Sequence, residues 1–501
     1  MRPNERYVYL ELGWTFYKTC SAASQIRILV IISIIIWLRG PAGSGKSTIL
    51  NTLAHYFLKL RRQGAFLFWD RNDPDNSEPR HVVHTLAHQL ALFDCSFAEE
   101  LHSQIEARPR ITESSLDAQF QHLLQEPLAA ISTKHDWGPI VIVLDALDEC
   151  GTPVSRKSLL KALSSSLPNL PNRFRLLIAS RDEPDIDATL SRLNIDVHDV
   201  PIDDESTSSD IKLLFQQHLA SDADVFVRCG LPPDWPGERV IQRLVTLSGG
   251  LFIWASTTIR FIESGFPEER LEKVLSASAQ GTSHARLDDL YRVALTHPFE
   301  SYDESELEAV HSILGAIVVS REQLTDEQLS RLLGLTVGKV HHVLSRLQPL
   351  LRGGHGRPAQ LLHTSFTDFL CDPKRCPDPQ WHVNASIHHL SLASGCFQVM
   401  HRDLKLNICG IETSYCRNKE IPGIEERINQ AITPVLMYAS QYWADHLESG
   451  FLSTSDSPAL ADAVIDFINN RLLYWIEVFS LKDRMSMLSI ILNKAVNWAR
   501  V

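Results

Sequence analysis

Residues 40–48 have the types and spacing of a loop that binds phosphate. The stretch reads Gly40-Pro-Ala-Gly-Ser-Gly-Lys-Ser-Thr48 and fits the pattern G-x-x-x-x-G-K-[ST]. Glycines let successive backbone N–H groups turn toward phosphate oxygens. In this pattern the lysine supplies positive charge to the β- and γ-phosphates, and the serine hydroxyl can ligate Mg²⁺. The predicted nucleotide-binding residues are therefore Gly40, Pro41, Ala42, Gly43, Ser44, Gly45, Lys46, Ser47 and Thr48.

A second set of acidic side chains follows a strongly apolar stretch. Ile140–Leu144 is a continuous apolar run that ends in Asp145, with Asp148 and Glu149 shortly after. A carboxylate at the end of a buried strand is where Mg²⁺ needs a second protein ligand beside a phosphate loop. We therefore predict Ser47 and Asp145 as metal ligands. Asp148 and Glu149 are the candidates for orienting or activating the attacking water; the alternative is a solvated acidic turn.

A third strand is predicted over Arg175–Ser180, and Arg181 follows it. A cation at this point can sense the γ-phosphate, although an arginine after a strand is also a common surface residue. Ala65–Trp69 and Asp196–Ile202 are further strand candidates. The alternation of strands with helical stretches predicts a parallel sheet with the nucleotide at its carboxyl edge.

The elements around residues 40–48 must place the phosphate at a helix terminus. Ile28–Leu38 is rich in branched apolar residues, but it has 11 residues and a membrane span needs roughly 20. We interpret it as a buried parallel strand. Apolar residues then recur at helical spacing from Ile49 to Leu58. A strand, a loop and a helix in this order put the phosphate at the positive end of the helix.

The rest of the chain divides into regions of different pattern. We predict a poorly defined lead-in over 1–27, an α/β P-loop nucleotide-binding domain over 28–203 with helices flanking a parallel sheet, and a helical domain over 204–300. Two or three short helices and a strand predict a winged-helix domain over 301–372. Residues 373–501 are predicted to be all-helical, with aromatic anchors at Trp443, Trp475 and Trp498. In the segment 248–254, Ser-Gly-Gly-Leu-Phe-Ile-Trp, close packing and a nucleotide contact are both open.

Composition excludes several classes of protein. The formal net charge of −12 argues against sequence-independent nucleic-acid binding, which needs a basic face. The nine cysteines include no Cys-x-x-Cys pair, so a structural zinc site is not expected. Reduced thiols and a cytoplasmic location follow as the default expectation.

In combination, these motifs resemble the NACHT family of STAND P-loop NTPases, and more narrowly its fungal nephrocystin-like group. The matching pieces are Trp37–Ser47, Leu144–Cys150, Ala179–Arg181, Gly250–Ala255, Leu362–Leu370 and Tyr474–Phe479. The resemblance implies a switch that binds ATP or ADP with Mg²⁺ and hydrolyses ATP slowly. An ADP-bound closed monomer would be held by the winged helix, and exchange for ATP would allow oligomerisation. It also implies that His363 contacts the ADP β-phosphate.

The resemblance leaves the partners open. Members of the family usually carry an effector segment before the NTPase and a repeat array after it, and neither pattern is visible between residue 1 and Val501. A truncated form, a stand-alone paralogue or a helical sensor would each account for this. The alternative function is a degenerate scaffold that acts only through protein contacts.

Overall fold

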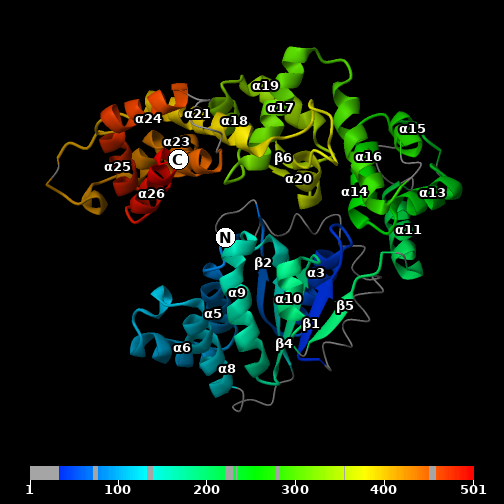
Figure 1. Cartoon of the computed structure of the whole chain (residues 1–501), viewed down its shortest axis with the longest axis horizontal. Helices are drawn as coiled ribbons and strands as arrows, with labels where there is room; N and C mark the ends of the chain where they lie inside the picture. The colour runs from blue at the N-terminus through cyan, green and yellow to red at the C-terminus, as the bar shows by residue number, and fades with distance from the viewer. Residues whose placement is uncertain are drawn as a thin grey trace. The chain divides into compact units, whose positions relative to one another are not determined.

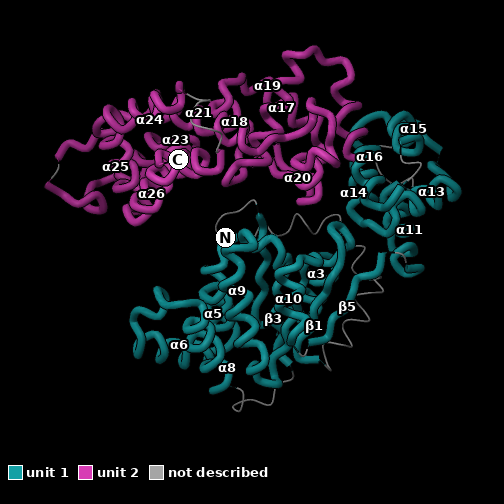
Figure 2. Tube along the Cα trace, in the orientation of Figure 1, with its two compact units in different colours: residues 1–290 teal, residues 291–501 magenta. Residues whose placement is uncertain are grey.

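The structure is a computed structural model that describes residues 33–71, 77–131, 139–193, 195–202, 204–219, 229–232, 234–277, 281–354, 356–413, 415–450 and 458–500. The lead-in predicted for 1–27 and the start of the strand predicted from Ile28 lie outside these residues. The chain forms two compact units, Met1–Leu290 and Tyr291–Val501 (Figure 2). Each unit is described by itself.

A five-stranded parallel sheet is the centre of the first unit (Figure 1). Its strands are β1 (Ile35–Arg39), β2 (Gln63–Phe68), β3 (Ile140–Asp145), β4 (Phe174–Ser180) and β5 (Asp196–Asp199), in the order β2-β3-β4-β1-β5. The parallel sheet predicted from the sequence is confirmed. β4 lies between β1 and β3 and pairs with both, Leu38 with Ala179 and Leu144 with Ile178. The ends of the two motif-bearing strands therefore flank the end of β4.

Helices cover both faces of this sheet, which explains why its inner strands are continuous apolar runs. One face packs against α3 (Lys46–Lys59), with Ile36 and Leu38 of β1 in that core. The other face, which carries Trp37, packs against a larger helical layer. That layer contains α5 (His81–Phe93), α6 (Cys95–Ala107), η3 (Ile111–Glu113), α7 (Leu116–Phe120), η4 (Gln121–Gln125), α8 (Glu126–Ile131), α9 (Pro153–Ser166), η6 (Leu167–Asn169) and α10 (Pro184–Leu190).

Helices follow β5 in the first unit. They are α11 (Glu205–Leu219), α13 (Glu238–Ser248), α14 (Phe252–Glu263), α15 (Pro267–Ala277) and the start of α16 (Ser283–Thr296). The helical domain is predicted to begin at residue 204, and α11 begins at Glu205. The predicted end of this domain at residue 300 differs from the boundary between the units, which falls at Leu290 inside α16.

The second unit opens with three helices and a hairpin. After η7 (His297–Phe299) come α17 (Glu304–Val319), α18 (Asp326–Leu333) and α19 (Val337–Arg346), then the antiparallel strands β6 (Leu351–Gly354) and β7 (Arg357–Leu361), and α20 (Thr364–Cys371). An isolated bridge joins Leu324 to Ala359. The elements from α17 to α20 lie within the predicted range 301–372; the assignment to a winged helix stays a prediction.

Helices also make up the rest of the second unit. They are α21 (Ala385–Asp403), η8 (Asn418–Glu420), α22 (Ile424–Ala431), α23 (Pro434–Ser449), α24 (Pro458–Asn470), α25 (Leu472–Leu481) and α26 (Met487–Ala499). Trp443 and Trp475 are buried, as predicted, but Trp498 is only partly buried. None of the described helices is long and apolar enough to cross a membrane.

A chain of buried polar rings runs between α21 and α23. The Tyr438 hydroxyl lies 2.9 Å from His446 Nε2, and His446 Nδ1 lies 2.8 Å from His389 Nδ1. Two facing ring nitrogens at this distance share one proton. Burial lowers the pKa of His389 to about 3 and that of His446 well below its ordinary value. These rings are therefore neutral at physiological pH.

Candidate nucleotide-binding site

The loop between β1 and α3 has the backbone geometry of an anion site. Gly43 and Gly45 adopt φ values of 77° and 92°, which residues with a Cβ atom rarely adopt. Gly45 is the N-cap of α3, and within the described residues no side chain caps this terminus. The first-turn N–H groups of α3 are therefore available to a ligand, and the helix dipole favours a negative one.

Lys46 points back along the loop. Its Nζ donates hydrogen bonds of 2.8 Å to the carbonyl oxygens of Gly40 and Pro41. Burial lowers the pKa of the amine to about 8; the nearby Asp148 carboxylate opposes this shift. A phosphate bound at the loop would add negative charge beside this buried ammonium.

Ser47 and Asp145 form the predicted metal pair. The Ser47 hydroxyl donates to Asp145 Oδ1 at 3.1 Å. Asp145 is fully buried at the end of β3, and its Oδ2 has no hydrogen-bond partner among the described residues. Burial raises the pKa of this carboxyl to about 7. An unsatisfied buried carboxylate oxygen beside a hydroxyl fits Mg²⁺, which takes one or two protein oxygens and completes its shell with water and phosphate oxygens.

The turn after Asp145 is strained. Ala146 has φ 59° and ψ 45°, the left-handed conformation that a residue with a Cβ adopts at a cost of about 1–3 kcal/mol. The chain then enters η5 (Leu147–Glu149). After this turn, the carboxylates of Asp148 and Glu149 have different hydrogen-bond partners.

Asp148 is committed to Arg181. Its Oδ1 accepts the backbone N–H of Arg181 at 3.0 Å, and its Oδ2 pairs with the Arg181 Nε at 3.1 Å. The Asp148 carbonyl also accepts Arg156 Nη1 at 2.6 Å. The sequence places these groups far apart, but β4 lies beside β3, so the two strand ends meet.

Glu149 has a different environment. One carboxylate oxygen accepts the backbone N–H of Arg71, which follows β2, at 3.4 Å. Burial raises the pKa of Glu149 to about 7, with further contributions from the negative charges of Asp148 and Asp70. Perturbed carboxyls in a phosphate site are candidates for proton transfer.

One participant, Arg156, was not predicted, whereas Ser44 was. Arg156 on α9 is 2% exposed and forms a two-pronged ion pair with Asp185 while it holds the Asp148 carbonyl. It lies inside a helical pattern, so no sequence signal marks it. The buried Ser44 hydroxyl lacks a partner among the described residues, and a phosphate oxygen near the loop would satisfy it.

His363 lies in the second unit as the N-cap of α20. Its Nδ1 accepts the backbone N–H of Ser365 at 3.0 Å. That bond leaves the proton on Nε2, which makes this nitrogen a donor. A donor is what a phosphate contact requires, but the contact itself joins the two units and stays a prediction.

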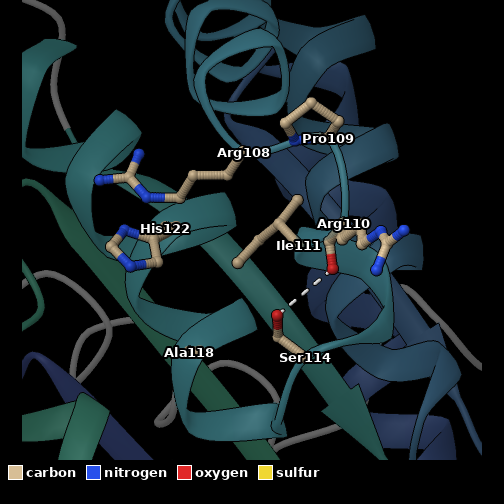
Figure 3. A pocket seen from close by; sticks show the side chains of 7 residues that line it. All are labelled: Arg108, Pro109, Arg110, Ile111, Ser114, Ala118 and His122. Atoms are coloured by element: carbon tan, nitrogen blue, oxygen red, sulfur yellow. Dashed lines mark hydrogen bonds between the residues drawn. The ribbon is translucent and has the colours of Figure 1, made fainter.

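A separate cavity of about 520 Å³ lies in the helical layer (Figure 3). It is lined by Arg108, Pro109, Arg110, Ile111, Ser114, Ala118 and His122. The guanidinium groups of Arg108 and Arg110 point away from each other in Figure 3. The lining includes none of the predicted site residues.

Comparison with known proteins adds to this geometry. Residues 32–181 match the family model described as nephrocystin 3, N-terminal. The match covers β1, the phosphate loop, β3 and the end of β4. The nephrocystin-like region thus contains the predicted site residues of the first unit. No curated protein sequence matches the chain at a significant level.

Several solved structures share features of the chain at low identity. A STAND protein with a tetratricopeptide repeat sensor from Pyrococcus horikoshii is 13% identical, with a TM-score of 0.40; the match covers 91% of this chain and 57% of that protein. A Walker-type ATPase of Pyrococcus abyssi is 13% identical, with a TM-score of 0.34, 69% of this chain and 93% of that one. A chain in the structure of Drosophila ORC bound to DNA is 11% identical, with a TM-score of 0.29; the match covers 99% of this chain and 91% of that one. These TM-scores lie below 0.5, so they do not fix the arrangement of the whole chain.

Proposed function

We propose that the chain is an ATP/ADP-binding switch of the NACHT/STAND type. The observation that carries this proposal is the fully buried Asp145 Oδ2 beside Ser47, below the N-terminus of α3: among the residues that the structure describes, this oxygen has no hydrogen-bond partner and no side chain caps the helix. A purely structural aspartate would be hydrogen-bonded at both oxygens, because an unpaired buried carboxylate oxygen is costly. The site therefore has the features of one completed by a cation and a phosphate.

The residues divide the work of binding. The loop N–H groups and Lys46 hold the β- and γ-phosphates, and Thr48 follows in the first turn of α3. Ser47 and Asp145 hold Mg²⁺, which when bound neutralises phosphate charge and orients the phosphate oxygens. Lys46 exchanges its carbonyl partners for phosphate oxygens. Preference for adenine rests on the resemblance alone.

Hydrolysis is proposed to be slow. Glu149 is the general base: its carboxylate takes a proton from the attacking water. Burial raises its pKa to about 7, so only part of the population carries the ionised carboxylate near neutral pH. Arg181 pairs with Asp148 through its Nε, so a γ-phosphate would share the guanidinium with that carboxylate. Asp148 then acts as the holder of Arg181, with the catalytic role as the alternative assignment.

The switch itself follows the family resemblance. We propose that His363 on a winged-helix segment contacts the ADP β-phosphate in a closed state, and that ATP releases this contact and permits self-association. We propose that the partners of the chain are nucleotides and proteins and do not include nucleic acid. The proposed location is the cytoplasm.

Analysis of co-purifying nucleotide tests this function. Purified protein is denatured, and the released nucleotide is separated and quantified. Near-stoichiometric ADP is expected from the wild type and from Lys59→Ala, which removes an exposed lysine from the last turn of the same helix. Lys46→Ala should release little or none. Absence of nucleotide from the wild type, together with no binding of added Mg·ATP, would favour the scaffold instead.

A further inference from the structure

The first turn of α14 lies directly against the phosphate loop. The backbone N–H of Ile253 donates to the Gly43 carbonyl at 3.3 Å. A Cβ added to Gly43 would lie 2.0 Å from Ile253 Cγ2, and one added to Gly45 would lie 3.1 Å from the Phe252 ring. Glycine is thus required at these positions for close approach as well as for positive φ.

α14 is itself anchored at this end. Gly250 has φ 76°, and a Cβ there would lie 1.7 Å from the carbonyl oxygen of Ile202, in the segment after β5. The Ser283 hydroxyl donates to the Gly249 carbonyl at 3.0 Å. The Trp254 indole N–H donates to the Arg286 carbonyl at 3.2 Å. The turn 249–251 is therefore fixed to the end of the sheet and to α16.

The contact acts on one peptide group of the loop. The Gly43 carbonyl and the Ser44 N–H belong to the same planar unit. Ile253 holds the carbonyl end, while the Ser44 N–H donates to the Pro41 carbonyl at 3.4 Å. With both ends bonded, the orientation of this peptide is set before any ligand arrives. A loop whose backbone is already ordered binds an anion better, because less ordering is required on binding.

We propose that Phe252 and Ile253 are positioning residues of the phosphate loop, so that phosphate affinity is coupled to the docking of α14. The inference rests on the proposed nucleotide-binding function. Coupling is reciprocal: a nucleotide that favours the ordered loop also favours docked α14, and α14 carries this effect to α16. Through the Gly-Gly-Leu-Phe-Ile stretch, the order of the phosphate loop is thus coupled to the position of the helices that follow β5.

A double-mutant cycle tests the coupling. Gly43→Ala, Ile253→Ala and the double variant are compared by calorimetric titration of the full chain with ADP and Mg²⁺. Gly43→Ala should weaken ADP about ten-fold or more. The loss should shrink by about three- to ten-fold when Ile253 is alanine, because the Cγ2 methyl at 2.0 Å is gone and only Cβ, at 2.7 Å, remains. Equal losses in both backgrounds would overturn the proposal.

Ile259→Ala is the matched control. Ile259 lies on the same helix and is 2% exposed, against 7% for Ile253, so both truncations empty a buried position. Ile253→Ala should weaken ADP about three-fold and Ile259→Ala should leave its affinity unchanged. If both variants weaken ADP alike, the effect is general destabilisation and the proposal fails.

Hydrogen exchange of the loop separates this inference from the function. In nucleotide-free protein, the amides of residues 43–47 should exchange faster in Ile253→Ala than in the wild type or Ile259→Ala. A wild type that binds no nucleotide removes the proposed function and the coupling together. A wild type that binds ADP, with unchanged loop exchange in Ile253→Ala, removes only the bracing by α14.

Discussion

Replacing Asp145 with asparagine should make the nucleotide-free protein more stable. Asp145 is fully buried, and its pKa rises from 3.8 to about 7. The native state therefore binds more protons than the unfolded state between these values, and stability falls as pH rises through that window. At 1.36 kcal/mol for each pH unit, the cost above pH 7 is about 4 kcal/mol.

Asparagine removes the charge but adds a donor. Its amide keeps an acceptor for Ser47, while the amide N–H₂ takes the place of the unpartnered oxygen, at a cost of about 1–3 kcal/mol. The net expectation is a gain of about 1–3 kcal/mol at pH 8 and a loss of about 1–3 kcal/mol at pH 4, where the charge cost is absent and the amide cost remains. Because unfolding of a chain with two units is not a single two-state step, the measurement is the shift in melting temperature rather than a free energy.

The assay is a thermal melt of both proteins from pH 4 to pH 8.5, without and with Mg·ATP. Asp145→Asn should melt several degrees higher at pH 8 without ligand, by roughly 2–4 °C for each kcal/mol, and should lose most of the stabilisation by Mg·ATP. Asp148→Asn is the contrast, since it breaks the pair with Arg181 and should lower the melting temperature. If Asp145→Asn also melts lower at pH 8, Asp145 is a structural residue and the reasoning is refuted.

The remaining predictions concern binding, chemistry and pH. Lys46→Ala should weaken Mg·ATP by about 2–4 kcal/mol in calorimetric titration, because loop donors remain but the charge is lost; unchanged affinity would reject the phosphate loop. Wild-type affinity for Mg·ATP should be highest between about pH 7 and pH 8. Asp145 is ionised above about pH 7 and Lys46 is charged below about pH 8, so both groups carry their charge in this range; a flat profile would contradict both assignments. Glu149→Gln should bind Mg·ATP normally but lower phosphate release in a steady-state assay, since an amide takes no proton; equal hydrolysis would move the base to another residue. His363→Leu should release a fluorescent ADP analogue roughly ten- to a hundred-fold faster in stopped flow, for a lost bond of about 1.5–3 kcal/mol, and unchanged release would remove it from the site. His446 is neutral when folded and gains a proton on unfolding below about pH 6.5, so the melting temperature of the second unit should fall between pH 7 and pH 5, and a constant value would show that the ring is charged in the folded state.

Sequence reasoning predicted the parts of the site that are local. The phosphate loop, the strand before it and the helix after it are contiguous, so spacing alone specifies their geometry. Ile140–Asp145 was placed correctly because five apolar residues before a carboxylate are typical of a buried parallel strand. In the second unit, Asp303, Thr325 and Thr336 are the N-cap residues of α17, α18 and α19, and each is a residue type that marks a helix start in the sequence.

Other features depend on strand order, which periodicity does not encode. The pairing of Asp148 with Arg181 requires β4 to lie beside β3, and nothing in the local pattern of either segment specifies a neighbour. The same holds for Arg156, whose partners are the Asp148 carbonyl, in the turn after β3, and Asp185 on α10. The contact of Ile253 with Gly43 joins residues that are 210 positions apart, so the glycine pair at 249–250 left packing and ligand contact equally open.

The position of β4 limits how this site can move. β1 is bonded to β4 and β5, and β3 to β2 and β4, so each motif strand is fixed on both edges. If the strand before Lys46 slid relative to the strand that ends in Asp145, the backbone hydrogen bonds between them and β4 would break. The sheet is therefore rigid in this direction. Any mechanical stroke must then come from parts outside the ladder, namely the strained turn at Ala146, the arginine beyond the tip of β4 and the first turn of α14. Force spectroscopy that pulls on the chain through the sheet should accordingly find the two motif strands separating together, in one rupture.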